Sequence, residues 1–192
     1  MNDEPLILPV LSGARVVLRE WRESDVSVVQ EASRDAMIPS ITTVPRTAGE
    51  PEALAYIRRQ HDRLRSGAGY AFAIADGEDR AVGHIGLFFA EGARATVGYW
   101  IAASVRHRGY AVDALTAVTS WAMTLDRLDR VELYIEPTNA GSIRVAERAE
   151  YEREGLLRAW KRIDGRARDM YMYSRLTEAA RRDALDDRRH EG

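Results

Sequence analysis

The chain contains no cysteine, and this absence excludes several kinds of chemistry at once. A disulfide framework, a thiolate metal site and a cysteine nucleophile all need a thiol. Lysine is also scarce, because Lys161 is the only one among 28 basic residues. The 28 basic and 30 acidic residues leave a formal charge of −2. This balance disfavours attraction of the whole surface to nucleic acid or to an anionic membrane, and we expect neither as a partner.

Long apolar runs are absent as well. No segment approaches the ~20 apolar residues that span a bilayer. The N-terminus carries Asp3 and Glu4 where a signal peptide carries basic residues, and Pro5 and Pro9 interrupt its short apolar run. We therefore expect a cytoplasmic protein. A length of 192 residues with 45 % apolar side chains suits one domain, expected over residues 1–176, with a charged C-terminal tail over 177–192.

Local patterns predict an alternation of strands and helices in the order β-αα-βββ-α-β-α-ββ. Turn signals such as Asp76-Gly77 and Asp164-Gly165 separate the strands. Ser24-Asp25 offers an N-cap for the first predicted helix, and the apolar spacing of the second predicts one face of Leu54, Ile57, His61 and Leu64. The predicted strands cover residues 14–20, 70–75, 81–89, 94–102, 131–135, 156–163 and 169–176, and the predicted helices cover 24–34, 51–65, 109–125 and 142–149. This order indicates an α+β domain with a mixed, mostly antiparallel sheet.

The most informative segment is a strand, a basic turn and a helix over residues 97–125. A helix start presents unpaired N–H groups and the positive end of the helix dipole, so it binds phosphates readily. Gly109 removes a side chain where an anion must approach the backbone, and Arg106, His107 and Arg108 add positive charge. The residues fit a diphosphate ligand and fit equally an ordinary turn with exposed arginines.

The run Arg-His-Arg-Gly-Tyr-Ala at 106–111 resembles the Arg/Gln-x-x-Gly-x-Gly/Ala signature of the GNAT superfamily of acyl-CoA-dependent N-acetyltransferases. The following segments are similar to the RimJ/RimL branch of that superfamily: Leu-Arg-Glu-Trp at 18–21, Gly-His-Ile-Gly-Leu at 83–87, Gly-Tyr-Trp-Ile at 98–101, Asn-Ala-Gly-Ser at 139–142, Val-Ala-Glu at 145–147 and Asp-Met-Tyr-Met-Tyr at 169–173. The resemblance covers residues 14–176. It implies the GNAT fold, in which two central parallel strands splay apart between flanking helices.

The resemblance also implies how acetyl-CoA binds. The backbone around Ile101 would bond the pantetheine arm, and Asn139 would bind a pantetheine amide, although Asn at this position also suits a helix N-cap. Ser142 would lie near the CoA sulfur as general acid, or serve merely as a polar residue of the first helical turn. The pyrophosphate would rest on the backbone amides of Arg106, His107, Arg108, Gly109, Tyr110 and Ala111. The four histidines show no ligand spacing, so we expect no metal.

The general base is the least defined part of the predicted site. Relatives often carry glutamate where this chain has Thr96, and sometimes where it has Lys161. Glu136, at the end of the splayed strand, is the predicted base, and His84 is the alternative. The amine could also enter neutral and lose its proton to water.

These features predict direct transfer of acetyl from acetyl-CoA to a primary amine, either a protein N-terminus or a small molecule, in a ternary complex. Residues 21–25, residues 37–46 and the last hairpin should form the acceptor site, which has no acidic cluster for polyamines and favours a weakly charged amine or a peptide N-terminus. A non-catalytic acyl-CoA sensor is the alternative that the missing glutamates favour. An enzyme for a bulkier acyl-CoA would depend on the space near residues 85–87 and Tyr99. A homodimer through the final strands stays open.

Overall fold

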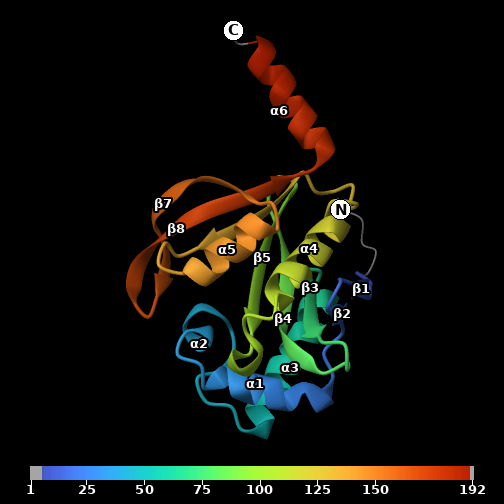
Figure 1. Cartoon of the computed structure of the whole chain (residues 1–192), viewed down its shortest axis with the longest axis vertical. Helices are drawn as coiled ribbons and strands as arrows, with labels where there is room; N and C mark the ends of the chain where they lie inside the picture. The colour runs from blue at the N-terminus through green and yellow to red at the C-terminus, as the bar shows by residue number, and fades with distance from the viewer. Residues whose placement is uncertain (1–5, 191–192) are drawn as a thin grey trace.

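The computed structural model describes residues 6–190 and has an eight-stranded sheet at its centre (Figure 1). The strand order is β1-β2-β3-β4-β5-β6-β8-β7, and every neighbouring pair is antiparallel except β5 and β6. The strands are β1 (Leu11–Ser12), β2 (Val17–Arg19), β3 (Gly69–Ala75), β4 (Ala81–Ala90), β5 (Arg94–Ile101), β6 (Arg130–Ile135), β7 (Glu152–Ile163) and β8 (Arg166–Leu176). The predicted mixed, mostly antiparallel sheet is confirmed. Residues 3 and 4, on which the expectation about a signal peptide rests, lie outside the described residues.

Helices cover both faces of the sheet and create two separate cores. Leu115 and Val118 of α4 pack on one face with Ala146 of α5, whereas Val29 of α1 and Ile57 of α3 pack on the other. The helices are α1 (Val26–Ser33), α2 (Ile38–Ile41), α3 (Glu50–Arg65), α4 (Tyr110–Ala122), α5 (Ala140–Arg148) and α6 (Glu178–His190), with short 3-10 turns at Glu23–Asp25 and Ala103–Val105. Within the described residues, every helix is too short or too polar to span a bilayer.

The parallel strands β5 and β6 are joined over only a short stretch. Their ladder pairs Arg94–Thr96 with residues 130–132 and then stops, although both strands continue. On the β4 side, the N–H group of Ala102 donates to the Val82 carbonyl at 2.9 Å. Backbone groups alternate in direction along a strand, so those of Val97, Tyr99 and Ile101 face the gap towards β6. The predicted splayed pair is therefore confirmed, with an open backbone edge.

The first predicted strand is shorter than expected. Residues 14–16 form a turn, because the carboxylate of Asp113 on α4 accepts hydrogen bonds from the N–H groups of Ala14, Arg15 and Val16 at 2.9, 2.6 and 3.1 Å. A side chain that lies 97 or more residues away in sequence thus replaces the sheet ladder here. This contact also fixes the turn beside the start of α4.

Two details of the helices also differ from the predictions. The buried face of α3 consists of Ala53, Tyr56, Ile57 and Gln60, whereas the apolar spacing predicted Leu54, Ile57, His61 and Leu64. The face rotates because Tyr56 enters an aromatic cluster beneath the sheet. Asp25 occupies the N-cap position of α1, but its carboxylate pairs with the Arg19 guanidinium at 2.9 Å instead of capping the helix.

Candidate functional site

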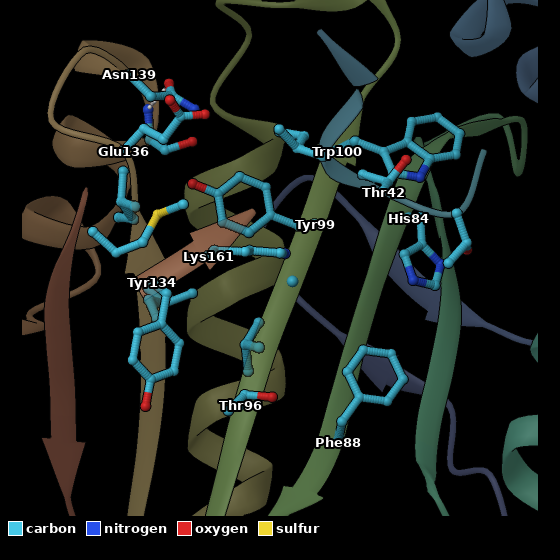
Figure 2. A pocket seen from close by; sticks show the side chains of 18 of the residues that line it. Thr42, His84, Phe88, Thr96, Tyr99, Trp100, Tyr134, Glu136, Asn139 and Lys161 are labelled. Carbon is cyan, nitrogen blue, oxygen red and sulfur yellow. Dashed lines mark hydrogen bonds between the residues drawn. The ribbon is translucent and has the colours of Figure 1, made fainter. Parts of the chain in front are cut away.

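A cavity of about 350 Å³ opens where β5 and β6 diverge (Figure 2). Its walls come from the two parted strands, from β4, from the end of α2 and the segment after it, from α3, from the start of α5, and from the hairpin of β7 and β8. The lining residues are Ile41, Thr42, Thr43, Tyr56, Arg63, His84, Phe88, Thr96, Val97, Gly98, Tyr99, Trp100, Leu133, Tyr134, Ile135, Glu136, Asn139, Ser142, Lys161, Ile163 and Met170. The predicted residues Asn139, Ser142 and Glu136 therefore meet in one place.

One wall of the cavity is a rigid aromatic cluster. Trp100 donates its indole N–H to the Tyr56 hydroxyl at 3.2 Å, and the ring of His84 stacks on Trp100 with a centroid distance of 6.3 Å. Trp21 lies behind this wall, 2 % exposed, and donates from Nε1 to Nδ1 of His84 at 3.3 Å. These hydrogen bonds hold the rings in place relative to one another. The cluster therefore determines the shape of this side of the cavity.

His84 is poorly suited to act as the general base. Burial and, to a smaller extent, the positive charge of Arg63 lower the pKa of its imidazole to about 3. The ring is therefore neutral near pH 7, and its Nδ1 already accepts the Trp21 hydrogen bond. A base with so low a pKa takes up a proton from an ammonium group only at a large free-energy cost.

Asn139 and Ser142 share the start of α5 but have different contacts. The Asn139 side-chain oxygen accepts the backbone N–H of Ser142 at 3.0 Å, so Asn139 is the N-cap of the helix. Its amide nitrogen lies 3.8 Å from the sulfur of Met37, and the side chain still borders the cavity. The predicted capping role is confirmed, and this polar nitrogen remains able to meet a ligand.

Tyr99 is a polar residue of the cavity to which the sequence assigned no role in the chemistry. Burial raises the pKa of its phenol to about 12, and its interaction with the Ser142 hydroxyl opposes that rise. The side chain projects from the open edge of β5 towards β6 (Figure 2). Ser142 and Tyr99 therefore both bring a hydroxyl group to the cavity between the parted strands.

Carboxylates occur near the gap in two positions. Glu136 lines the cavity at the end of β6, and its Oε2 lies 3.8 Å from Nε of Arg168. Thr96 also lines it, and directly beside Thr96 in the parallel ladder lies Glu132, which is 1 % exposed. Glu132 accepts the Tyr134 hydroxyl at 2.6 Å, and its other oxygen lies 2.9 Å from Nε of Arg130. Glu132 thus lies beside Thr96, but it is paired and does not line the cavity, so Glu136 is the carboxylate that does.

Gly109 lies where the basic turn meets the helix α4. Gly109 is the N-cap of the 13-residue helix α4, with a left-handed φ of 82° that favours glycine. Tyr110 and Ala111 begin the helix, so their N–H groups belong to its first turn. His107 and Arg108 are exposed beside the turn.

The side chain of Arg106 differs from the prediction. Its Nη2 pairs with Asp35 at 2.7 Å, and its Nε donates to the Ile101 carbonyl at 3.2 Å. Asp35 neutralises the positive charge that the sequence assigned to the phosphate turn. The Ile101 carbonyl, predicted to bond pantetheine, already accepts one hydrogen bond and keeps one lone pair.

A different arginine reaches the turn from far away in the sequence. A Cβ atom at Gly109 would lie 3.2 Å from Nη1 of Arg15, so that guanidinium borders the predicted phosphate site. Asp113 positions Arg15 by holding its backbone N–H at 2.6 Å. No local sequence signal connects Arg15 with the turn, and only the tertiary contact reveals it.

The predicted acceptor elements contribute unequally to the cavity. The segment 37–46 supplies Ile41, Thr42 and Thr43, and the last hairpin supplies Lys161, Ile163 and Met170. Among the described residues, 21–25 supply no lining side chain, because Trp21 is buried behind the aromatic wall. Ile85 and Leu87, named for acyl-chain space, lie in the core shared with α4, whereas Tyr99 lines the cavity. Within residues 6–190, no three potential metal ligands gather.

Comparison with known proteins gives consistent matches. Residues 15–152 match the family model described as "Acetyltransferase (GNAT) domain". The chain is 27 % identical over 165 residues to "Uncharacterized N-acetyltransferase p20" of Bacillus licheniformis, covering 84 % of this chain and 93 % of that protein. It superposes on RimJ of Mycobacterium smegmatis in complex with CoA-disulfide with a TM-score of 0.76 at 22 % identity, covering 94 % of this chain and 95 % of that one. RimL, a ribosomal L7/L12 alpha-N-protein acetyltransferase solved with coenzyme A, also gives 0.76, at 19 % identity, covering 89 % and 99 %.

Proposed function

Since the chain belongs to the GNAT acetyltransferase family and is an acyl-CoA-dependent N-acetyltransferase with acetyl-CoA as its co-substrate, we propose that it acetylates a primary amine directly. The ternary complex would form in the cavity between β5, β6 and the last hairpin. The observation that carries the proposal is the short β5–β6 ladder, which leaves an open backbone edge facing the residues Ser142 and Glu136.

Several features of the chain fit the proposed acetyl-CoA site. The free N–H and C=O groups of Val97 and Tyr99 would bond the amides of the pantetheine arm as a β-like partner. The left-handed Gly109 brings the backbone amides of the α4 start close to an approaching pyrophosphate. Arg106 is paired with Asp35, so its charge is neutralised. Arg15, beside Gly109, would supply the positive charge at the pyrophosphate instead.

In the proposed reaction, acetyl-CoA supplies the thioester whose acetyl group is transferred. Glu136, directly or through water, accepts a proton from the amine as the new C–N bond forms. Ser142 donates a hydrogen bond or its proton to the sulfur as the C–S bond breaks, and the Tyr99 hydroxyl beside it can orient that donor. Backbone N–H groups on the edge of β5 polarise the carbonyl group, and the aromatic wall holds the acceptor in position.

The proposed acceptor is either a protein N-terminus or a small-molecule amine. The structural likeness to RimL, whose own description names a ribosomal alpha-N-protein substrate, supports the first of these classes. The enclosed volume of about 350 Å³ is compatible with both, because a peptide needs to insert only its first residue. We also propose that the RimJ/RimL-like group is the branch of the family to which the chain belongs.

The test is release of free thiol from acetyl-CoA during incubation with a panel of amines and N-terminal peptides. We expect release well above the amine-free control and a product heavier by one acetyl group in mass spectrometry. Butyryl-CoA and longer thioesters, run in parallel, measure the preferred acyl length. Tyr99 lines the cavity, so its ring limits the room for a longer acyl chain. Thiol release that never rises above the amine-free control with any acceptor would contradict the proposed reaction.

A further inference from the structure

Positively charged side chains outnumber negatively charged ones in the lining of the cavity. Only Arg63, Lys161 and Glu136 among the lining residues carry a charge at neutral pH, and Glu136 has Arg168 at 3.8 Å. Within residues 6–190, neither Arg63 nor Lys161 has a carboxylate at ion-pair distance. The sequence indicated no charge cluster of one sign, because Arg63 lies on α3, outside the predicted acceptor elements. The cavity therefore has two cations without anionic partners.

Arg63 is held at the cavity wall by neutral groups. Its guanidinium lies 4.7 Å from the centre of the Phe88 ring, and its Nη2 donates to the Thr43 hydroxyl at 3.3 Å. Burial lowers its pKa, while the nearby Tyr56 phenol partly offsets this shift. Arginine stays charged even so, and a partly desolvated cation without a counter-ion favours binding of an anion.

Lys161 is directed into the cavity by an irregularity of β7 (Figure 2). Pairing between β7 and β8 is interrupted between Leu157 and Lys161, where Ala159 has a φ of 52°. The Ala159 N–H leaves the ladder and donates to the Asp169 carboxylate at 2.8 Å. Irregularities of this kind change the direction of side chains near binding sites. The irregularity of β7 therefore places the chain's one lysine in the wall of the cavity, where the acceptor would bind.

We propose that the acceptor amine carries an anionic group, a carboxylate or a phosphate, and that Lys161 and Arg63 bind this group. The inference rests on the proposed acetyl transfer, since it names the class of amine that enters the same cavity. Complementary charge would orient the acceptor so that its nitrogen points towards the gap between β5 and β6. Two nearby cations also disfavour the protonated form of the amine, which is the form that cannot attack.

The experiment compares pairs of acceptors that differ only in the anion. Glycine is paired with glycinamide, phosphoethanolamine with ethanolamine, and an Ala-Asp peptide amide with its Ala-Asn counterpart. Thiol release from acetyl-CoA is followed as kcat/KM for each pair. We expect the anionic member of at least one pair to exceed its partner by about tenfold or more, and the preferred pair identifies a free amino acid, a phosphate ester or an acidic N-terminus.

The variant Lys161→Met tests the assignment to this side chain. We expect it to lower kcat/KM for the preferred anionic acceptor about 10–100-fold, the range of a charge-assisted hydrogen bond, and to change that for the neutral partner less than about threefold. Arg162→Met is the matched control, because Arg162 lies next in the strand, is exposed, and donates to the Gly165 carbonyl outside the cavity. It should leave both rates unchanged.

The remaining outcomes separate this inference from the proposed reaction. Transfer to neutral amines as fast as to anionic ones, or equal loss for both members of a pair in Lys161→Met, would overturn the anion-binding role and leave acetyl transfer standing. Absence of thiol release with every acceptor would overturn the proposed reaction itself. Arg63→Met removes the second cation and should also weaken the preference for the anionic acceptor. If Arg63→Met fails to fold, Arg63→Lys replaces it, because lysine keeps the charge. A folded Arg63→Lys protein with an unchanged preference for the anion supports charge recognition.

Discussion

Ser142 and Asn139 divide two roles within one helical turn. Asn139 caps α5 through its side-chain oxygen, and Ser142 contributes only its backbone N–H to that cap. The Ser142 hydroxyl is therefore free of the capping function that a polar residue in this position usually has. The Ser142 side chain also lines the cavity. This division allows chemistry and stability to be tested by separate substitutions.

Replacing Ser142 by alanine should slow the reaction without unfolding the helix. If its hydroxyl assists departure of the sulfur, kcat should fall by about 10²–10⁴-fold, as is typical of a general acid, while the Kd for acetyl-CoA changes little. The melting temperature should stay close to that of the wild type, since the capped N–H remains. Steady-state kinetics and thermal unfolding measure both quantities.

The matched variant for this test is Asn139→Asp. It keeps a capping oxygen and removes the amide nitrogen, so we expect stability to persist and acetyl-CoA affinity to fall. A kcat of Ser142→Ala within a few-fold of the wild type would remove the proposed acid role from this residue.

His84 should give the folded protein a measurable dependence on pH. Its pKa is about 3 in the fold and near 6.5 when unfolded, so the unfolded chain binds the proton first as pH falls. This group therefore stabilises the fold fully above pH 6.5 and progressively less down to about pH 3. A single proton of this kind changes the free energy of unfolding by about 1.4 kcal/mol per pH unit.

Thermal unfolding between pH 7.5 and pH 5 measures this effect. The variant His84→Gln, which has a donor and an acceptor but no titrating ring, should show a flatter pH dependence than the wild type. An equally steep slope in His84→Gln would assign the pH dependence to other groups.

At the scale of elements, the start of α4 allows a specific test of cofactor binding. Gly109→Val adds a branched side chain at a φ of 82°, where a Cβ would also lie 3.2 Å from Nη1 of Arg15. Left-handed backbone costs a non-glycine residue roughly 1–2 kcal/mol, so some loss of stability is expected. Because the side chain also obstructs approach to the backbone amides, the affinity for acetyl-CoA should fall more than about tenfold, measured by calorimetry.

Gly67→Val separates strain from obstruction in this test. Gly67 has a φ of 72° with no atom within 4 Å of a Cβ, and it does not line the cavity. It should lose comparable stability and keep its affinity. Unchanged affinity in a folded Gly109→Val protein would exclude this turn as the phosphate site.

The elements themselves were largely predictable, whereas their surroundings were not. Periodicity and turn residues located the longer strands and the helices α1, α3, α4 and α5, since these signals are local. The loss of strand structure at Ala14–Val16 was not predictable, because its cause, the Asp113 carboxylate, lies 97–99 residues away. The capture of Arg106 by Asp35 and the approach of Arg15 to Gly109 have the same origin. Family resemblance supplied the site residues, and tertiary structure supplied their partners.

For the whole molecule, the division into a domain and a tail at residues 176 and 177 stays a prediction that can be tested. Helix α6 extends away from the sheet and its covering helices (Figure 1). Arg181 lies 3.7 Å from the exposed Glu152, a surface pair of the kind that contributes about 0–1 kcal/mol. Deleting residues 178–192 should therefore change the free energy of unfolding by less than about 1 kcal/mol and leave acetyl-CoA affinity intact.

Chemical denaturation and calorimetry of the truncated chain check this expectation. The truncated chain keeps the Thr177 N–H, which donates to the Asp129 carbonyl at 2.8 Å, so the end of β8 stays anchored. Size-exclusion chromatography of both forms also tests the open question of a homodimer through β7 and β8. A large loss of stability or a change in assembly on truncation would make α6 part of the domain.

The narrow junction between β5 and β6 also affects how the molecule unfolds. Among the described residues, the β5–β6 ladder has three residue pairs, and the Asp129 N–H group adds one hydrogen bond to the Ala93 carbonyl beside it. One apolar core packs across this junction, but the backbone itself couples the unit β1–β5 only weakly to the unit β6–β8. Weakly coupled units can open separately, as subglobal steps below the free energy of complete unfolding. A ligand bonded to both edges would merge them into one cooperative unit. The co-substrate would then determine whether the protein unfolds in one transition or in two.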